Sequence, residues 1–109
     1  MLLTTTHNVE GHKIAEYYGV VSAEAVMGAN VIRDFVAGIT DIIGGRSGVY
    51  EGKLHQAKEV VLAELIEEAR KLGANAVVGI NVDFEELRGT MLMIVATGTA
   101  VKIEPISSK

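Results

Sequence analysis

The chain has 109 residues, a net charge of −4 at pH 7 and no cysteine, and 49% of its residues are hydrophobic. This length suits a single domain, which we expect to span residues 1–109 with a loose tail at 104–109. The lack of cysteine excludes disulfides and thiolate metal sites. The acidic balance provides no field to attract nucleic acid or an anionic membrane, so we expect neither as a partner.

The N-terminus predicts a cytoplasmic protein. Residues 1–6, Met-Leu-Leu-Thr-Thr-Thr, lack the basic start and the long apolar run of a secretory signal. The longest apolar run, Met91–Val101, is too short to span a bilayer.

The first half of the chain predicts strands and then a helix. We expect a short strand at 2–5, a turn at 6–11 and a strand at 13–26, bent by a bulge at Gly19. A helix should follow from Asn30, its N-cap, to Ile43. Its apolar residues recur at helical spacing: Val31, Ile32, Phe35, Val36, Ile39, Ile42 and Ile43.

A long amphipathic helix is predicted from Val49 to Leu72, and Gly73 should end it in the left-handed conformation. One apolar stripe comprises Tyr50, Leu54, Ala57, Val61, Leu65, Ala69 and Leu72. A second stripe comprises Val60, Leu62, Ala63 and Ile66, which makes the apolar arc wider than one sheet needs. Glu67 and Lys71 have the spacing of a favourable ion pair.

Two strands should complete the chain as a hairpin around Arg88–Gly89. In the first, alternation places one set of side chains on the buried face: Ala76, Val78, Ile80, Val82 and Phe84. The opposite face then carries Val77, Gly79, Asn81, Asp83 and Glu85. The sequence therefore predicts an α+β fold, in which a small antiparallel sheet of three to four strands packs on one short and one long helix, in the order β-β-α-α-β-β.

The last strand, 90–103, is apolar on both faces. Met91, Met93, Val95, Val101 and Ile103 share one face, and Leu92, Ile94, Ala96 and Ala100 share the other. Two helices can cover only one face, so the second would expose a larger apolar patch than soluble monomers usually show. A second copy of the chain is the simplest cover, and we expect an obligate homo-oligomer.

The glycine-rich loop 44–48 precedes the long helix, where free backbone N–H groups and the helix dipole favour an anion. Arg46 could clamp such an anion and Ser47 could donate a hydroxyl. The alternative is a turn between helices with Ser47 as N-cap, which the absence of a phosphate-loop motif favours.

His7 and His12 flank a four-residue turn and could form a metal site with Glu10. Imidazole and carboxylate suit Zn, Ni, Cu or Fe. The alternative, that both rings are exposed and idle, is more common at hairpin tips.

Asp83 and Glu85 form an acidic strand end that could bind a cation or act as acid and base. The favoured alternative is a solvated face, or an ion pair to Arg33 or Arg46 of another copy. The pairs Arg33–Asp34 and Tyr50–Glu51 could likewise join subunits or line a pocket. No Ser/His/Asp or Cys/His arrangement is legible, so we expect no enzymatic activity.

Several blocks resemble the YbjQ-like family of small bacterial proteins, which is often labelled heavy-metal-binding. They are residues 28–34, 44–51, 73–79 with Asp83, 91–93 and 98–100. The resemblance implies a dodecin-like subunit in a ring-shaped homo-oligomer, a pentamer. The motif positions that it transfers are Arg33, Asp34, Arg46, Tyr50, Glu51 and Asp83.

We therefore hypothesise a homo-oligomeric, non-enzymatic binding protein that holds a metal ion or small ligand at its subunit interfaces. One alternative is a structural or partner-binding ring with no small-molecule site. Another, less favoured, is an enzyme with Asp83 or Glu51 as base.

Overall fold

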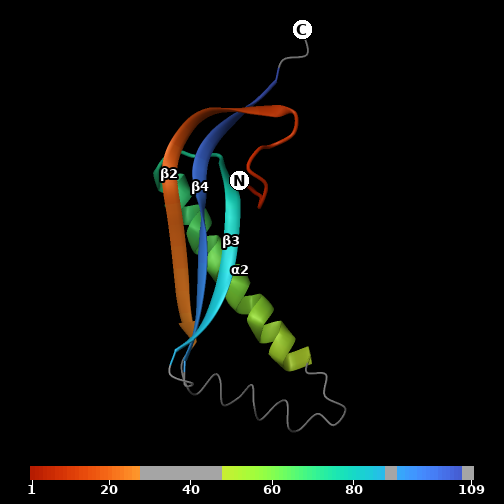
Figure 1. Ribbon diagram of the computed structural model, residues 1–109, viewed down its shortest axis with the longest axis vertical. Helices are drawn as coiled ribbons and strands as arrows, with labels where there is room; N and C mark the ends of the chain where they lie inside the picture. Colours follow the sequence, from red (N-terminus) through yellow and green to blue (C-terminus); the bar gives the residue numbers. More distant parts are fainter. Residues whose placement is uncertain (28–47, 88–90, 107–109) are drawn as a thin grey trace.

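A computed structural model describes residues 1–27, 48–87 and 91–106 (Figure 1). Its elements are β1 (Leu2–Leu3), β2 (His12–Met27), α2 (Gly48–Lys71), β3 (Ala76–Leu87) and β4 (Met91–Pro105). The helix expected at 30–43 and the turn at Arg88–Gly89 lie outside these residues. Within them, no helix is both long and apolar enough to cross a membrane.

The four strands form one sheet in the order β1-β3-β4-β2, and α2 lies diagonally across one face (Figure 1). β4 is central and pairs antiparallel with β3 and with β2, as the hairpin prediction requires for β3 and β4. The α+β class is confirmed, but the expectation of a purely antiparallel sheet is wrong, because β1 runs parallel to β3. No hairpin joins these two strands, so nothing forces them to be antiparallel.

The N-terminal segment covers part of the outer edge of β3. The backbone N–H of Thr4 donates to the carbonyl of Val77 at 3.0 Å, and the N–H groups of Gly79 and Ile80 donate to Thr6 and Thr4 at 2.8 and 3.1 Å. The chain then passes across the end of the sheet to reach β2 (Figure 1). The N-terminal segment therefore satisfies the edge of β3 only as far as Ile80.

A bulge in β3 changes which side chains share a face, and the predicted alternation was wrong on this point. The register with β4 shifts between Val78 and Asn81, and Gly79 has φ +62°. The extra residue reverses the alternation. Val77 joins Ile80 in the core under the helix, whereas Val78 packs on the opposite face. Glycine fits this position because it lacks the Cβ that disfavours positive φ.

The main core lies between α2 and the sheet. Val61, Leu65 and Ala69, spaced four residues apart, are fully buried and cluster with the equally buried Ile94 and Ala96 of β4. The second predicted stripe is different, because Val60 is 50% exposed and Ala63 is also exposed. The helix thus carries more apolar surface than its own sheet covers.

Local features of α2 and β2 agree only partly with those predicted from the sequence. Gly73 has φ +89° and Gly19 lies at a register shift in β2, so both glycine predictions are confirmed. The expected Glu67–Lys71 ion pair does not form. Glu67 pairs with Arg70 and Glu68 with Lys71, because i,i+3 geometry brings these charges together at the last turn.

β4 also reaches further than expected. Glu104 and Pro105, placed in a loose tail by the sequence analysis, pair with Lys13 and His12, and Ile106 N–H donates to Gly11 at 2.9 Å. Residues 107–109 lie outside the described part of the chain.

Among the described glycines, Gly98 leaves the least room for a side chain. A Cβ there would lie 2.6 Å from Val77 Cγ1 and 3.1 Å from Ile80 Cγ1. We expect Gly98→Ala to lower the free energy of unfolding by about 1–3 kcal/mol through overpacking, measured by chemical denaturation at one fixed protein concentration. Val77→Ala removes the clashing methyl, so the double variant should lose less stability than the sum of the single losses. Additive losses would contradict this account.

Candidate functional site

The sheet face opposite α2, here called the open face, carries apolar side chains that the described residues of one copy leave exposed. Cross-strand partners share a face, and the register therefore defines its members. They are Val20, Ser22, Glu24 and Val26 of β2, Met91, Met93, Val95, Thr97 and Thr99 of β4, and Asn81, Asp83 and Glu85 of β3. Val20 is 79% exposed and Val26 is 52% exposed.

Among residues 1–27, 48–87 and 91–106, cover on this side of the sheet is found at one end only. There Val78 and Val101 are buried, with Val9, Ile14 and Ile103 packed against their cluster. Val9 comes from the turn that crosses the end of the sheet. The open face lies beyond the reach of this turn.

The outer edge of β2 is long and has no pairing strand among the described residues. Its first half contains both register shifts, at Ile14/Glu16 and Tyr17/Gly19, and bulges of this kind protect sheet edges. From Val20 to Met27 the pairing with β4 is unbroken, and this half contains one charged residue, Glu24. It is therefore an unprotected edge.

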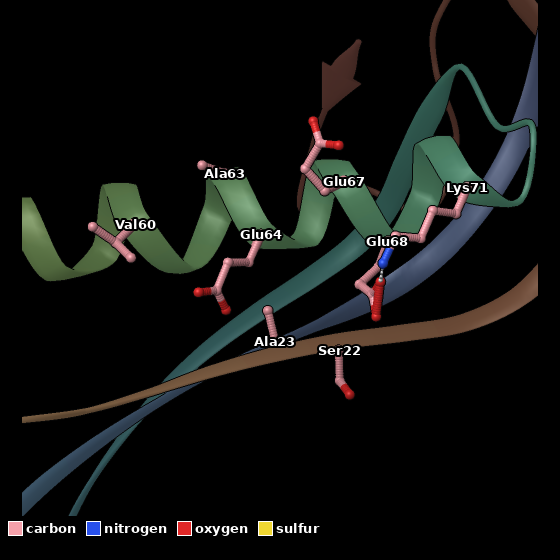
Figure 2. A pocket seen from close by; sticks show the side chains of 8 residues that line it. All are labelled: Ser22, Ala23, Val60, Ala63, Glu64, Glu67, Glu68 and Lys71. Atoms are coloured by element: carbon pink, nitrogen blue, oxygen red, sulfur yellow. Dashed lines mark hydrogen bonds and ion pairs between the residues drawn. The ribbon is translucent and has the colours of Figure 1, made fainter.

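A groove of about 500 Å³ lies between this edge and α2 (Figure 2). Its apolar lining comes from Ala23, Val60 and Ala63. Glu64 and Glu68 point from the helix toward the strand, whereas Glu67 points away (Figure 2). Lys71 Nζ lies 3.1 Å from Glu68 Oε2 and partly neutralises this rim. We call this feature the β2 groove; it offers an apolar floor and an acidic rim.

His7 and His12, the two histidines of the predicted metal site, contact different parts of the chain. His7 lies beside the bulge, with its Nδ1 3.5 Å from where a Cβ on Gly79 would stand. His12 begins β2, and its Nδ1 lies 3.1 Å from the carbonyl oxygen of Glu10. Across residues 1–27, 48–87 and 91–106, no three His, Cys, Asp or Glu side chains gather closely enough to hold a metal ion.

The other predicted site residues are only partly visible. Asp83 lies exposed on the open face, where its Oδ2 accepts a 2.7 Å hydrogen bond from Asn81 Nδ2. Tyr50 and Glu51 belong to the first turn of α2. Arg33, Asp34, Arg46 and Ser47 lie outside the described residues, so the glycine-rich loop hypothesis remains a prediction.

The β2 groove does not follow from the sequence pattern. The available signal was the second apolar stripe of the long helix, since Val60 and Ala63 belong to it and line the groove. This stripe is more apolar surface than one sheet can cover. Which strand lies beside it depends on the order of the strands in the sheet, and the periodicity of the sequence does not specify that order.

Comparison with known proteins shows the family of the chain. A family model described as "Putative heavy-metal-binding" (YbjQ_1) matches residues 1–104. A UPF0145 protein of Geobacillus thermodenitrificans is 58% identical over 104 residues, which cover 95% of this chain and all of that one. A UPF0145 protein of Halalkalibacterium halodurans is 59% identical over 103 residues, covering 94% of this chain and 96% of its own.

A solved structure shares the fold. It is the crystal structure of a DUF74-family protein of unknown function from Pediococcus pentosaceus, with a TM-score of 0.66. The alignment covers 95% of this chain and 98% of that chain, at 19% sequence identity. At this identity the likeness supports the fold alone.

The pKa of Tyr18, which is affected by the neighbouring Glu16, provides a testable prediction. Desolvation, the negative charge of Glu16 and a 3.3 Å hydrogen bond from the phenol to Glu16 Oε1 raise the pKa of Tyr18 above its usual 10.0. Because the unfolded chain loses this proton first, stability should fall as the pH rises above 10. We expect Glu16→Gln to bring the pKa of Tyr18 closer to 10 in an ultraviolet titration, with Tyr18→Phe identifying the signal. An unchanged titration in Glu16→Gln would contradict this assignment.

Proposed function

The chain belongs to the YbjQ-like family, and we propose that it is a non-enzymatic, homo-oligomeric binding protein that holds a metal ion or small ligand at its subunit contacts. The observation that carries the proposal is the open face, which leaves Val20 79% exposed and Val26 52% exposed in a single copy. The proposal includes the two-helix, dodecin-like subunit and the five-membered ring that the family resemblance implies.

The physical argument for assembly concerns apolar area. Full burial of one large aliphatic side chain contributes about 1.5–3 kcal/mol relative to leaving it exposed. The open face carries five such side chains, Val20, Val26, Met91, Met93 and Val95, in two adjacent strands. Covering them with other copies would offset part of the cost of association, which small scattered surface residues could not do.

We place the ligand at the contacts between copies because charged residues of the family motifs would lie there in the proposed assembly. Asp83 lies on the open face itself, and Glu51 lies in the first turn of α2. Carboxylates and an arginine such as Arg46 can hold a cation or an anionic ligand when two copies bring them together. The family description, which names heavy metals, supports the metal form of the proposal.

Native mass spectrometry on untagged protein, purified without chelator, tests this function. We expect an oligomer, five copies in our proposal, with a stoichiometric extra mass that identifies a metal or an organic ligand. An Arg46→Ala variant should keep the oligomer and lose the extra mass, because Arg46 would contact the ligand.

The other outcomes separate the alternatives. An oligomer without extra mass, even after incubation with divalent metal ions, would contradict the binding role and leave a structural ring. A monomer would contradict assembly itself. Loss of the oligomer in Arg46→Ala would make Arg46 a subunit contact.

A further inference from the structure

We propose that a groove between α2, β3 and the N-terminal segment, here called the Lys58 groove, binds a free single-chain carboxylate such as a medium-length fatty acid. The groove has a volume of about 460 Å³, and small-ligand sites usually measure about 300–1,000 Å³. It lies within one copy, so this inference goes beyond the proposed function and does not depend on assembly. The described residues that line it are Leu3, Thr4, Thr5, Lys58, Leu62, Ile80 and Val82.

The floor of the Lys58 groove is a part of the main core that remains incompletely covered. Leu3, Leu62 and Val82 pack against the core cluster and are only half-buried. Ile80 belongs to the cluster itself. These side chains come from three separate segments that the fold brings to one groove. A hydrocarbon chain laid along them would remove apolar surface from water, which is the main driving force for binding of this kind.

The charge at the rim of the groove is a single ammonium group. Lys58 is the charged residue of the described lining, and it is half-buried. It forms no ion pair with a carboxylate of residues 1–27, 48–87 and 91–106. The carboxylate of the neighbouring Glu59 instead lies 3.5 Å from Nε2 of His55. An ammonium group beside an apolar floor is complementary to a ligand that combines one negative charge with one apolar chain.

Backbone hydrogen bonds hold the threonine side of the groove in place. The N–H of Thr4 donates to the carbonyl of Val77 at 3.0 Å, and the N–H of Ile80 donates to the carbonyl of Thr4 at 3.1 Å. The Thr4 hydroxyl bonds that of Thr6 at 2.8 Å. Thr5 is exposed, and its hydroxyl can donate to a carboxylate oxygen. The groove therefore exists before a ligand binds, which lowers the cost of binding.

The β2 groove provides a comparison along the same helix, because its rim has the opposite charge. Its described lining contains Glu64, Glu67 and Glu68, and its cation, Lys71, lies 3.1 Å from the Glu68 carboxylate. A further carboxylate would be repelled there. An anionic ligand with an apolar chain should therefore select the Lys58 groove over the β2 groove.

A free carboxylate fits the Lys58 groove better than a phosphate group or a membrane surface does. Phosphates are usually bound by several donors, such as arginine side chains or the N–H groups of a helix N-terminus. The Lys58 groove instead offers an ammonium group and threonine hydroxyls at the middle of α2. The net charge of −4 opposes approach to an anionic membrane.

Isothermal titration calorimetry of the full chain with octanoate at pH 7 tests the site. We expect one octanoate to bind per chain. Hexanoate should bind more weakly, by up to about fourfold for each CH₂ that is no longer buried, the equivalent of about 0.8 kcal/mol. Equal affinities for octanoate and hexanoate would contradict the apolar floor as part of the site.

Substitution of Lys58 tests the charge at the rim. Lys58→Gln should raise the Kd for octanoate about tenfold, as loss of a hydrogen bond between charged groups does. It should leave the Kd for 1-octanol unchanged, since the alcohol has the same chain length and no charge. Lys71→Gln is the matched control, because it makes the same charge change in the β2 groove of the same helix. Its Kd for octanoate should equal that of the wild type.

The other outcomes separate this inference from the proposed function. An oligomer that does not bind octanoate, equal weakening by Lys58→Gln and Lys71→Gln, or equal loss of octanoate and 1-octanol binding in Lys58→Gln would overturn the Lys58 groove alone. Binding to phosphatidylglycerol vesicles that requires Lys58 would overturn the free ligand in favour of a membrane. A monomer that binds one octanoate through Lys58 would support this inference and contradict the proposed assembly.

Discussion

The structure depends on one constraint: the central strand β4 is apolar on both faces, and one described helix covers only one of them. On the covered side, Ile94, Ala96 and Ala100 are fully buried beneath α2. On the other side, Met93 and Val95 are only half-buried within the sheet. In the proposed function, this imbalance is the reason for assembly and for placing a ligand between copies.

The bulge at Gly79 determines which side chains of β3 face the core and which face the opposite side of the sheet. By shifting the alternation, it directs Val77 and Ile80 into the core while leaving Val78 on the opposite face. The N-terminal segment binds β3 up to the same point and goes no further. The remaining edge of β3 therefore combines exposed Phe84 on one side with Asp83 on the other, which gives it the features of a contact surface.

Much of the fold could be predicted from the sequence, because local signals were strong. The left-handed Gly73, the bulge at Gly19, the long helix and the pairing of the last two strands all depend on residues close together in the chain. The bulge at Gly79 was missed, since a glycine within an alternating strand does not reveal that it adds a residue. The parallel β1 was also missed, because a strand of two residues contains no information about its distant partner.

The candidate site was less predictable for the same physical reason. The β2 groove joins residues 22–23 to residues 60–71, and only the sheet order brings these segments together. The surplus apolar stripe indicated only that the helix carries a wider apolar arc than one sheet needs. Sequence periodicity reports which side of an element is apolar, but it does not report what lies beside it.

Sedimentation equilibrium over a range of protein concentrations tests most directly the proposal that the open face is covered by other copies of the chain. The account predicts an assembly of several copies at high concentration that dissociates on dilution. A protein that stays monomeric at high concentration would contradict it, because the apolar side chains of the open face would then remain in contact with water.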